Sequence, residues 1–309
     1  AVRRWALELD GAEPARVKPD GDVPAEAILE LADRVARWHA AQRPADVVLE
    51  VEPGVVLERR WVALDTVGVY VPRGLISTLV MCAVPAQIAG VRRLVVCTPP
   101  DGAGTIAAAA MLLGLDEVWA LGGPQAIGFL AYVEHVDKIV GPGNAYVNEA
   151  KLEVWRDVPI DLPGGPYEVI VVGDGDPRLV ELELAAQREH GHEAVCTTVA
   201  TIEEAEAIAP EHLVLLGDAE RHADTVRNAG AVFVGPWSPV PAGDYATGGN
   251  HVLPTNGWAR SVGGLGLETF LKPVTVQRLT REGLEAIRAA IEALAAAEGM
   301  PAHAEAARR

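Results

Sequence analysis

Short apolar runs, glycine turns and longer segments with helical spacing alternate from residue 66 to residue 155. Each run is rich in Val, Ile and Leu and has the length of a buried strand, and the segments between the runs place apolar residues as helices do. Such alternation is typical of a parallel, doubly wound sheet. The pattern predicts strands at 67–71, 94–97, 117–121 and 138–140, with helices at 77–89, before Gly114, after Gln125 and up to Trp155.

The same alternation returns between residues 168 and 235 and predicts a second set of parallel strands. The expected fold is therefore α/β, with two Rossmann-like doubly wound domains whose sheets are mostly parallel. The tail from Thr280 to Arg309 is rich in Ala, Glu and Arg and reads as helix, interrupted at Gly299. The predicted strands are 168–173, 195–200, 213–216 and 231–235, and the helices are 177–190, 202–209 and 219–229.

Ahead of the first alternating region, apolar residues at helical spacing over 23–41 predict an amphipathic helix. Val-rich alternation then predicts strands at 46–51 and 55–62. We expect three domains. Residues 1–67 with 168–265 form a discontinuous domain, 68–167 form a second domain, and 266–309 form a helical tail.

Composition narrows the classes of partner. The net charge of −17 argues against nucleic acid and anionic membrane surfaces, which need clustered cations. Cys82, Cys97 and Cys196 show no paired spacing, so neither a disulfide framework nor a Cys-type zinc site is expected. No apolar run reaches the length of a membrane helix, and the first residues do not resemble a signal peptide. These features predict a cytoplasmic protein without a membrane partner.

Three glycine turns follow predicted strands at 72–74, 122–125 and 141–144. Ligands of doubly wound sheets bind beyond the carboxyl ends of the strands, so these turns could cradle a dinucleotide phosphate. None of them is the G-x-G-x-x-G fingerprint. Simple tight turns are an equally good interpretation.

Candidate metal ligands lie in the glycine-rich stretch 243–255, which is not expected to be helical. Asp244 and His251 are donors that zinc accepts, although a turn with a surface histidine is the commoner occurrence of such a pair. Gln187 and His190 lie three positions apart near a predicted helix end and share a face. On spacing alone, they could be a chance polar pair.

Glu211 and His212 follow Pro210 in a predicted loop. A carboxylate and an imidazole are the commonest general acid–base groups, yet an adjacent pair is more often a solvated surface feature. His303 lies in the terminal tail, where a histidine is usually exposed. Each of these signals is weak by itself.

Together, the motifs resemble histidinol dehydrogenase, in that family's order and over about 27–303. The most specific is Gly-Asp-Tyr-Ala-x-Gly-x-Asn-His-Val-Leu-Pro-Thr at 243–255. The others are Gly-Val-Tyr-Val-Pro at 68–72, Pro-Ala-x-x-Ala-Gly-Val at 85–91, Gly-Gly-Pro-Gln-Ala-Ile at 122–127, Val-Asp-Lys-Ile-Val-Gly-Pro-Gly-Asn at 136–144, Gln-x-Glu-His at 187–190 and Pro-Glu-His-Leu at 210–213.

The resemblance implies oxidation of L-histidinol to L-histidine through L-histidinaldehyde, with two NAD and one zinc per active site. It implies that His212 is the base, that Glu211 activates water, and that an intertwined homodimer shares its sites. It also implies that the discontinuous domain, 1–67 with 168–265, binds metal and substrate, that 68–167 is NAD-binding-like, and that the tail 266–309 makes the dimer contact. By the same resemblance, the zinc ligands are Gln187, His190, Asp244 and, from the other subunit, His303; the NAD contacts are Tyr70, Gln125 and Asn144; and the substrate contacts are His251, Glu298 and the position of Tyr167.

Three departures from the family pattern bear on function. The loop after Pro72 is short and has Arg73 where glycine is usual. Tyr167 stands where the family has a substrate-contacting serine, and the chain between Gln187 and Glu211 is shorter than in relatives. Two alternatives therefore stay open: a paralogue that oxidises another amino alcohol or polyol, and a metal-binding protein that has lost redox activity.

Overall fold

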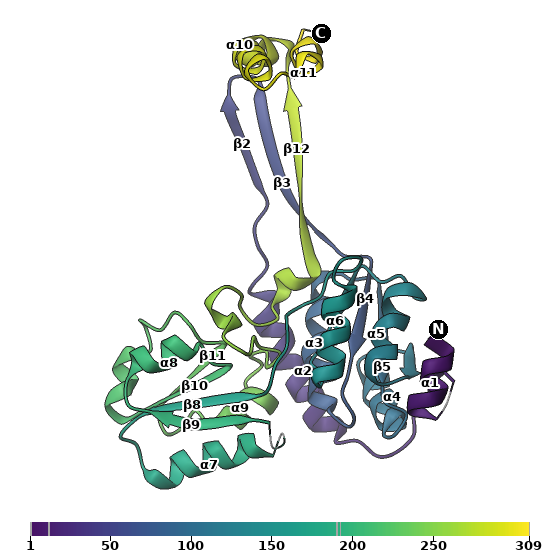
Figure 1. The fold of residues 1–309 in the computed structure, drawn as a ribbon, viewed down its shortest axis with the longest axis vertical. Helices are drawn as coiled ribbons and strands as arrows, with labels where there is room; N and C mark the ends of the chain where they lie inside the picture. Colours follow the sequence, from purple (N-terminus) through teal and green to yellow (C-terminus); the bar gives the residue numbers. More distant parts are fainter. Residues whose placement is uncertain (1, 12, 190, 192, 309) are drawn as a thin grey trace. The chain divides into compact units, whose positions relative to one another are not determined.

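The structure is a computed structural model that describes residues 2–11, 13–189, 191 and 193–308 (Figure 1). Its contacts divide the chain into two compact units. The first contains residues 1–43 and 64–270, and the second contains residues 44–63 and 271–309. The fold is mixed α/β with two parallel sheets, both in the first unit. Within the described residues, no helix is long and apolar enough to cross a membrane.

The first sheet has the strand order β1-β6-β5-β4-β7. Its four main strands run parallel, and the short β1 (Ala15–Arg16) pairs antiparallel with β6 at the edge. Because β4 follows β5 and β6 in space but precedes them in the chain, the order reverses between β4 and β7. The parallel strands are β4 (Thr66–Tyr70), β5 (Arg93–Thr98), β6 (Val118–Ala120) and β7 (Lys138–Val140).

Two groups of helices pack beside this sheet. One group contains α2 (Ala25–Ala40), α3 (Ile76–Ala89) and α4 (Ala103–Leu112), and the other contains α1 (Val2–Asp10), α5 (Gly123–Tyr132) and α6 (Ala145–Val154). α3 ends at Gly90, whose positive φ forms the expected left-handed cap. β1 pairs with β6 of the first sheet and α1 contacts α5, so the N-terminal segment packs with the first sheet and not with the second, where it was predicted.

The second sheet has the order β11-β10-β8-β9, and all its strands are parallel. Its order reverses between β8 and β10. One core cluster joins this sheet to α7 and α9, and another covers its opposite face beside α8. The elements are β8 (Glu168–Gly173), α7 (Pro177–Arg188), β9 (Val195–Val199), α8 (Ile202–Ile208), β10 (His212–Leu216), β11 (Ala231–Val234) and α9 (Val240–Tyr245).

Two local predictions in this region are wrong. The predicted helix 219–229 is a short 3-10 helix, Gly217–His222, followed by turns that still pack Ala223 and Val226 against the core. The apolar spacing is thus satisfied without a full helix. The stretch 243–255 is not free of helix, because α9 continues to Tyr245. Gly243 is needed inside α9 since a Cβ there would press on the Phe233 ring.

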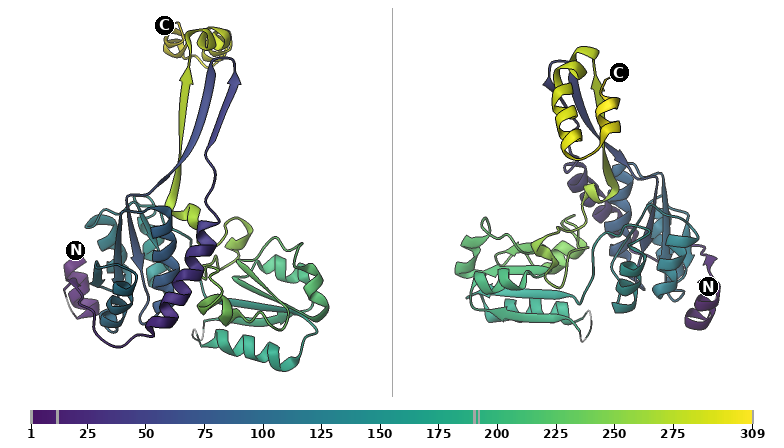
Figure 2. Two further views of the ribbon diagram at one scale, coloured as in Figure 1. Left: turned by 180° about the vertical axis from the view of Figure 1, so that it is seen from behind. Right: turned by 45° about the horizontal axis from the view of Figure 1, so that its top comes forward.

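The second unit is a three-stranded antiparallel sheet in the order β12-β3-β2, with two helices. Its strands are β2 (Val47–Glu52), β3 (Val55–Ala63) and β12 (Leu271–Leu279); its helices are α10 (Arg281–Ala297) and α11 (Pro301–Ala306), which contact each other at one end of the sheet (Figure 2). The predicted helical tail 266–309 therefore begins with a strand, since residues 271–279 pair along the whole of β3.

Candidate active site

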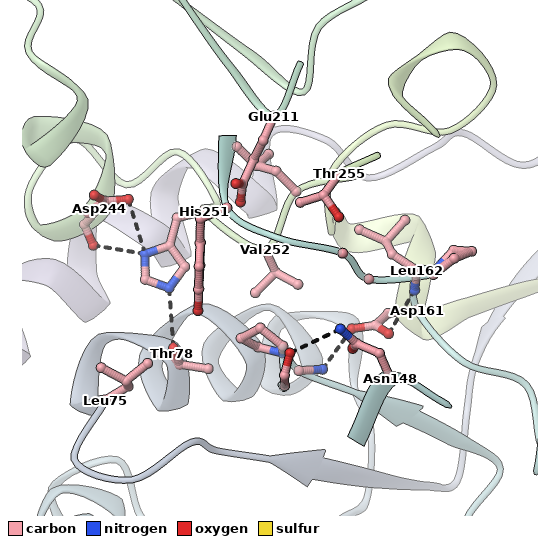
Figure 3. A pocket seen from close by; sticks show the side chains of 18 of the residues that line it. Leu75, Thr78, Asn148, Asp161, Leu162, Glu211, Asp244, His251, Val252 and Thr255 are labelled. Atoms are coloured by element: carbon pink, nitrogen blue, oxygen red, sulfur yellow. Dashed lines mark hydrogen bonds and ion pairs between the residues drawn. The ribbon is translucent and has the colours of Figure 1, made fainter. Parts of the chain in front are cut away.

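One pocket of the first unit is lined by both parallel sheets (Figure 3). Gly141 and Pro142 come from the carboxyl end of β7, at the reversal point of the first sheet. Glu211 and His212 come from the amino end of β10 in the second sheet. About 770 Å³ of space lies in this pocket and its open mouth.

The predicted acid–base pair is buried in this pocket, not on the surface. Glu211 and His212 are each 3% exposed. His212 Nδ1 lies 3.0 Å from the carbonyl oxygen of Glu168. Since a carbonyl oxygen can only accept, Nδ1 carries the hydrogen, and Nε2 is the basic atom of the neutral ring.

Glu168 holds both members of the pair. Its backbone N–H donates to Glu211 Oε2 (3.0 Å), while its own carboxylate accepts from the Glu211 N–H (3.2 Å) and from the Asn256 N–H (3.0 Å). These reciprocal bonds join the first residue of β8 to the residue that precedes β10. The position of the His212 ring is therefore set by backbone geometry.

Burial makes the carboxyl groups here less acidic. It raises the pKa of Glu211 well above its ordinary value, and the nearby charges of Glu168 and Asp244 add to this effect. Burial also raises the pKa of Glu168. A carboxyl group with a raised pKa can exchange protons near neutral pH, as a general acid–base group must.

Asp244 and His251 meet at one end of the pocket (Figure 3). His251 Nδ1 lies 3.6 Å from Asp244 Oδ1 and 3.2 Å from the Asp244 carbonyl oxygen. His251 Nε2 lies 3.5 Å from the Thr78 hydroxyl on α3. Burial, with a smaller contribution from Glu183, raises the pKa of Asp244 to about 6. A nearby cation would favour the ionised form of such a carboxyl group.

Gln187 lies on α7, which faces α9. Glu183, one turn before Gln187, accepts a hydrogen bond from the Val240 N–H at the start of α9 (3.0 Å). Gln187 is 2% exposed, and its amide nitrogen has no hydrogen-bond partner among the described residues. A buried amide N–H without an acceptor fits a ligand that brings a hydrogen-bond acceptor to it.

Three other predicted residues are not among the described residues that line this pocket. His190 lies outside the described residues. His303 on α11 and Glu298 at the end of α10 belong to the second unit. Among residues 2–11, 13–189, 191 and 193–308, no three His, Cys, Asp or Glu side chains are arranged to hold a metal ion.

The predicted NAD contacts follow strands of the first sheet. The Gly123 N–H donates to the Tyr70 hydroxyl (3.3 Å), and the side-chain oxygen of buried Gln125 has no donor among the described residues. Asn144 caps α6 by accepting from the Val147 N–H (3.1 Å). A second pocket contains Asn144 together with Tyr167. The unused acceptor of Gln125 lies at the carboxyl edge of the sheet, where doubly wound folds bind dinucleotides.

Tyr167 lines both pockets. Burial, followed by the charges of Glu211 and Asp244, raises the pKa of its phenol to about 12. Tyr167 therefore stays neutral and places a bulky hydroxyl-bearing ring beside the acid–base pair.

Comparisons with known proteins decide the family. The sequence model described as histidinol dehydrogenase matches residues 17–207 and 199–309. The chain is 40% identical to the histidinol dehydrogenase of Gluconobacter oxydans, covering 97% of this chain and 83% of that protein. For the enzyme of Methanothermobacter thermautotrophicus the identity is 39%, covering 92% and 80%. The chain belongs to the histidinol dehydrogenase family.

A solved structure agrees with this assignment. The crystal structure of histidinol dehydrogenase from Elizabethkingia anophelis is 32% identical and matches with a TM-score of 0.89, over 99% of this chain and 87% of that one. An acetylating aldehyde dehydrogenase from Geobacillus thermoglucosidasius has a TM-score of 0.56 at 11% identity, which indicates a shared fold only. The resemblance inferred from the motifs is confirmed, and the protein is an oxidoreductase of this family.

Several residues of the candidate site were missed by the sequence analysis. Lys151 and Asp161 form a buried ion pair that holds both backbone groups of Gly141. Glu168 was treated only as the start of a strand. Their neighbours in the sequence are mostly apolar, so they were read as parts of helices or strands. A single charged residue in such a pattern does not indicate which distant residue it contacts. His39, buried on α2, lies 3.3 Å from the Asn250 amide beside His251.

Proposed function

We propose that this protein is a zinc- and NAD-dependent dehydrogenase that oxidises L-histidinol to L-histidine through L-histidinaldehyde. Its family and the names of its relatives supply the reaction. The observation that carries the proposal is the buried His212, whose Nδ1–H is held by the Glu168 carbonyl beside Glu211. In this proposal, the two parallel sheets act as Rossmann-like halves of a cytoplasmic enzyme.

His212 Nε2 takes the proton of the substrate alcohol while a hydride leaves its carbon for NAD. Removing the proton and the hydride leaves the aldehyde. Glu211 then accepts a proton from water that adds to the aldehyde carbon, and the resulting hydrate anion loses a second hydride, to a second NAD, to give the carboxylic acid. The raised pKa of Glu211 suits it to hold that proton.

Zinc bound at Asp244 and Gln187, with His190 and the His303 of a second subunit, would hold the substrate and stabilise developing negative charge. His251 would contact the substrate from beside Asp244, and Glu298 of the second subunit would bind it as well. Tyr70, Gln125 and Asn144 would bind NAD. Because the aldehyde must stay bound between two oxidations, the enclosed pocket suits the reaction.

The decisive measurement is NADH formation from L-histidinol. We expect turnover that is abolished by a chelator and restored by zinc. His212→Asn should lower kcat by about 10²–10⁴-fold, because it removes the general base. His222→Asn, in the turn after β10, is a matched control that should keep full activity. An unaltered chain that is loaded with zinc but forms no NADH would overturn the proposal.

Tyr167 favours one alternative, a related dehydrogenase acting on another amino alcohol or polyol. Its bulk lies in the pocket beside Glu211, where a differently shaped substrate would be required. A panel of amino alcohols in the same assay separates the two, since the alternative predicts a better substrate than L-histidinol. Failure to bind NAD would instead indicate a metal-binding protein without redox activity.

We also propose a homodimer with shared sites. All six residues of β2 are exposed, and Val48 is 68% exposed. Exposed apolar side chains along a strand are typical of a surface that another chain covers. The second unit also carries His303 and Glu298, which the proposed site needs.

Mixing two inactive variants tests this arrangement. His212→Asn and His303→Asn should each be inactive alone. If sites are shared, a mixed dimer has one site that contains both native residues, and random reassembly should restore roughly a quarter of full activity. No recovery from co-expressed variants, or a monomeric mass in solution, would contradict the shared site.

A further inference from the structure

Asn148, on α6, has one side-chain atom that the fold satisfies and one that it does not. Its amide nitrogen donates to the Gly143 carbonyl oxygen (3.0 Å). Because that carbonyl can only accept, the orientation of the amide is settled, and Oδ1 points away from Gly143. Asn148 is 7% exposed, and Oδ1 has no donor among the described residues.

A buried amide oxygen without a donor is costly, since water solvates it in the unfolded chain. Native proteins rarely keep such atoms unless a ligand or water completes them. The segment over Asn148 is shaped around this amide, because a Cβ on Gly164 would overlap both Oδ1 and Nδ2. Only glycine there leaves the amide where it is.

Asn148 lines the pocket of Glu211 and His212 and also the pocket of Asn144. The two pockets therefore meet at this side chain. On one side are the proposed catalytic groups, and on the other is a proposed NAD contact that caps the same helix, α6. A ligand group reaching Oδ1 lies where a hydride could pass from the substrate to the dinucleotide.

We infer that Asn148 Oδ1 accepts a hydrogen bond from the carboxamide N–H of the nicotinamide ring, and that it is a specificity residue for that carboxamide. The inference rests on the proposed function. It deepens that function by naming the atom that selects a carboxamide-bearing dinucleotide.

A neutral donor fits this position better than a cation. Lys151, one turn along α6, is buried and paired with Asp161, so the local charge is already balanced. A substrate ammonium would add an unpaired charge beside that pair, whereas an amide N–H adds none. The substrate would be held by the proposed zinc at Asp244, which lies at the other end of the pocket (Figure 3).

The test compares the binding of two dinucleotides by the unaltered protein and by its variants. The two probes are NADH and the reduced 3-acetylpyridine analogue, in which a methyl group replaces the carboxamide NH₂. Dissociation constants are measured by calorimetry on the full chain. The unaltered protein should prefer NADH by about 5- to 100-fold, the range expected for one buried hydrogen bond.

Asn148→Leu keeps the size of the side chain and removes the acceptor, so the preference should fall to about one. Asn148→Ala carries the same prediction and replaces the leucine variant if leucine does not fold under Gly164. Thr255→Val is the matched control. Thr255 also lines the pocket with a buried, unsatisfied oxygen, and its loss should leave the preference for NADH unchanged.

Each outcome bears on the inference. Equal affinities in the unaltered protein, or a preference kept in the Asn148 variants, would overturn it and leave the proposed function standing. A loss of affinity confined to L-histidinol would assign Oδ1 to the substrate and overturn it too. Failure of the unaltered chain to bind either dinucleotide and to oxidise L-histidinol would remove the proposed function and this inference together.

Discussion

The two parallel sheets present opposite ends to the same pocket. The first sheet contributes the turn after β7, at its carboxyl edge and beside its reversal point. The second contributes His212, the first residue of β10, next to Glu168, the first residue of β8. The usual rule that parallel sheets bind ligands at their carboxyl ends holds for one sheet and not for the other.

The closed end of the second sheet explains the difference. At its reversal point, Gly173 packs against the Leu216 carbonyl, and Asp174 accepts a hydrogen bond from the Asp218 N–H (3.1 Å). These contacts occupy the space where a ligand would bind. At the first sheet, Lys151 and Asp161 hold the backbone of the corresponding turn, and the turn lines the pocket together with them. Strand direction alone does not locate a site; the packing of the turns decides.

A matched pair of glycine substitutions gives the largest expected effect. Gly141 and Gly173 follow or end a strand at the reversal point of their sheets, with φ of +112° and +110°. A Cβ would overlap the Tyr70 carbonyl oxygen in one case and the Leu216 carbonyl oxygen in the other. Either Gly→Ala change should lower the free energy of unfolding by about 2–5 kcal/mol, measured by urea denaturation.

The two variants should differ in ligand binding. Gly141→Ala moves the turn that faces the proposed dinucleotide, so its dissociation constant for NADH should rise at least about tenfold. Gly173→Ala acts at the closed end, and its dissociation constant should stay within about twofold of the unaltered protein. Equal losses in both variants would show that the closed end also governs binding, and the contrast between the sheets would fail.

Periodicity was enough to predict most of the fold. Strands of buried Val and Ile, such as β4, β8 and β10, were found because apolar runs between glycine turns have few other interpretations. The prediction of a helix at 219–229 was wrong because a short 3-10 helix and turns can bury apolar residues at the same spacing. The helical tail was incomplete because the strand 271–279 pairs with β3, which lies over two hundred residues away in the chain.

The candidate site could be predicted only in part. The pairing of Glu211 with His212 followed from adjacency, and Asp244 with His251 from a glycine-rich motif. Glu168 could not be found in the same way, since its role depends on β8 pairing with β10. The position of the Asn148 amide depends on Gly164, sixteen positions later in the chain. Contacts between distant segments leave no local pattern in a sequence.

The end of the second sheet that faces the pocket, where Glu211 is buried, should also affect how the stability of the protein depends on pH. The folded-state pKa of Glu211 is raised by burial, so the native protein binds this proton more tightly than the unfolded chain. The resulting stability is complete below the ordinary value of 4.5 and is lost as the pH rises through the folded-state pKa.

Glu211→Gln removes this loss of stability and keeps an oxygen that can accept from the Glu168 N–H. Urea unfolding of the metal-free protein should find the variant more stable at pH 8, by about 1–3 kcal/mol, and little changed at pH 4.5. If the variant is less stable at pH 8, the protein must stabilise the ionised Glu211 carboxylate in its buried position. The open end of the second sheet would then cost no more stability than the closed end.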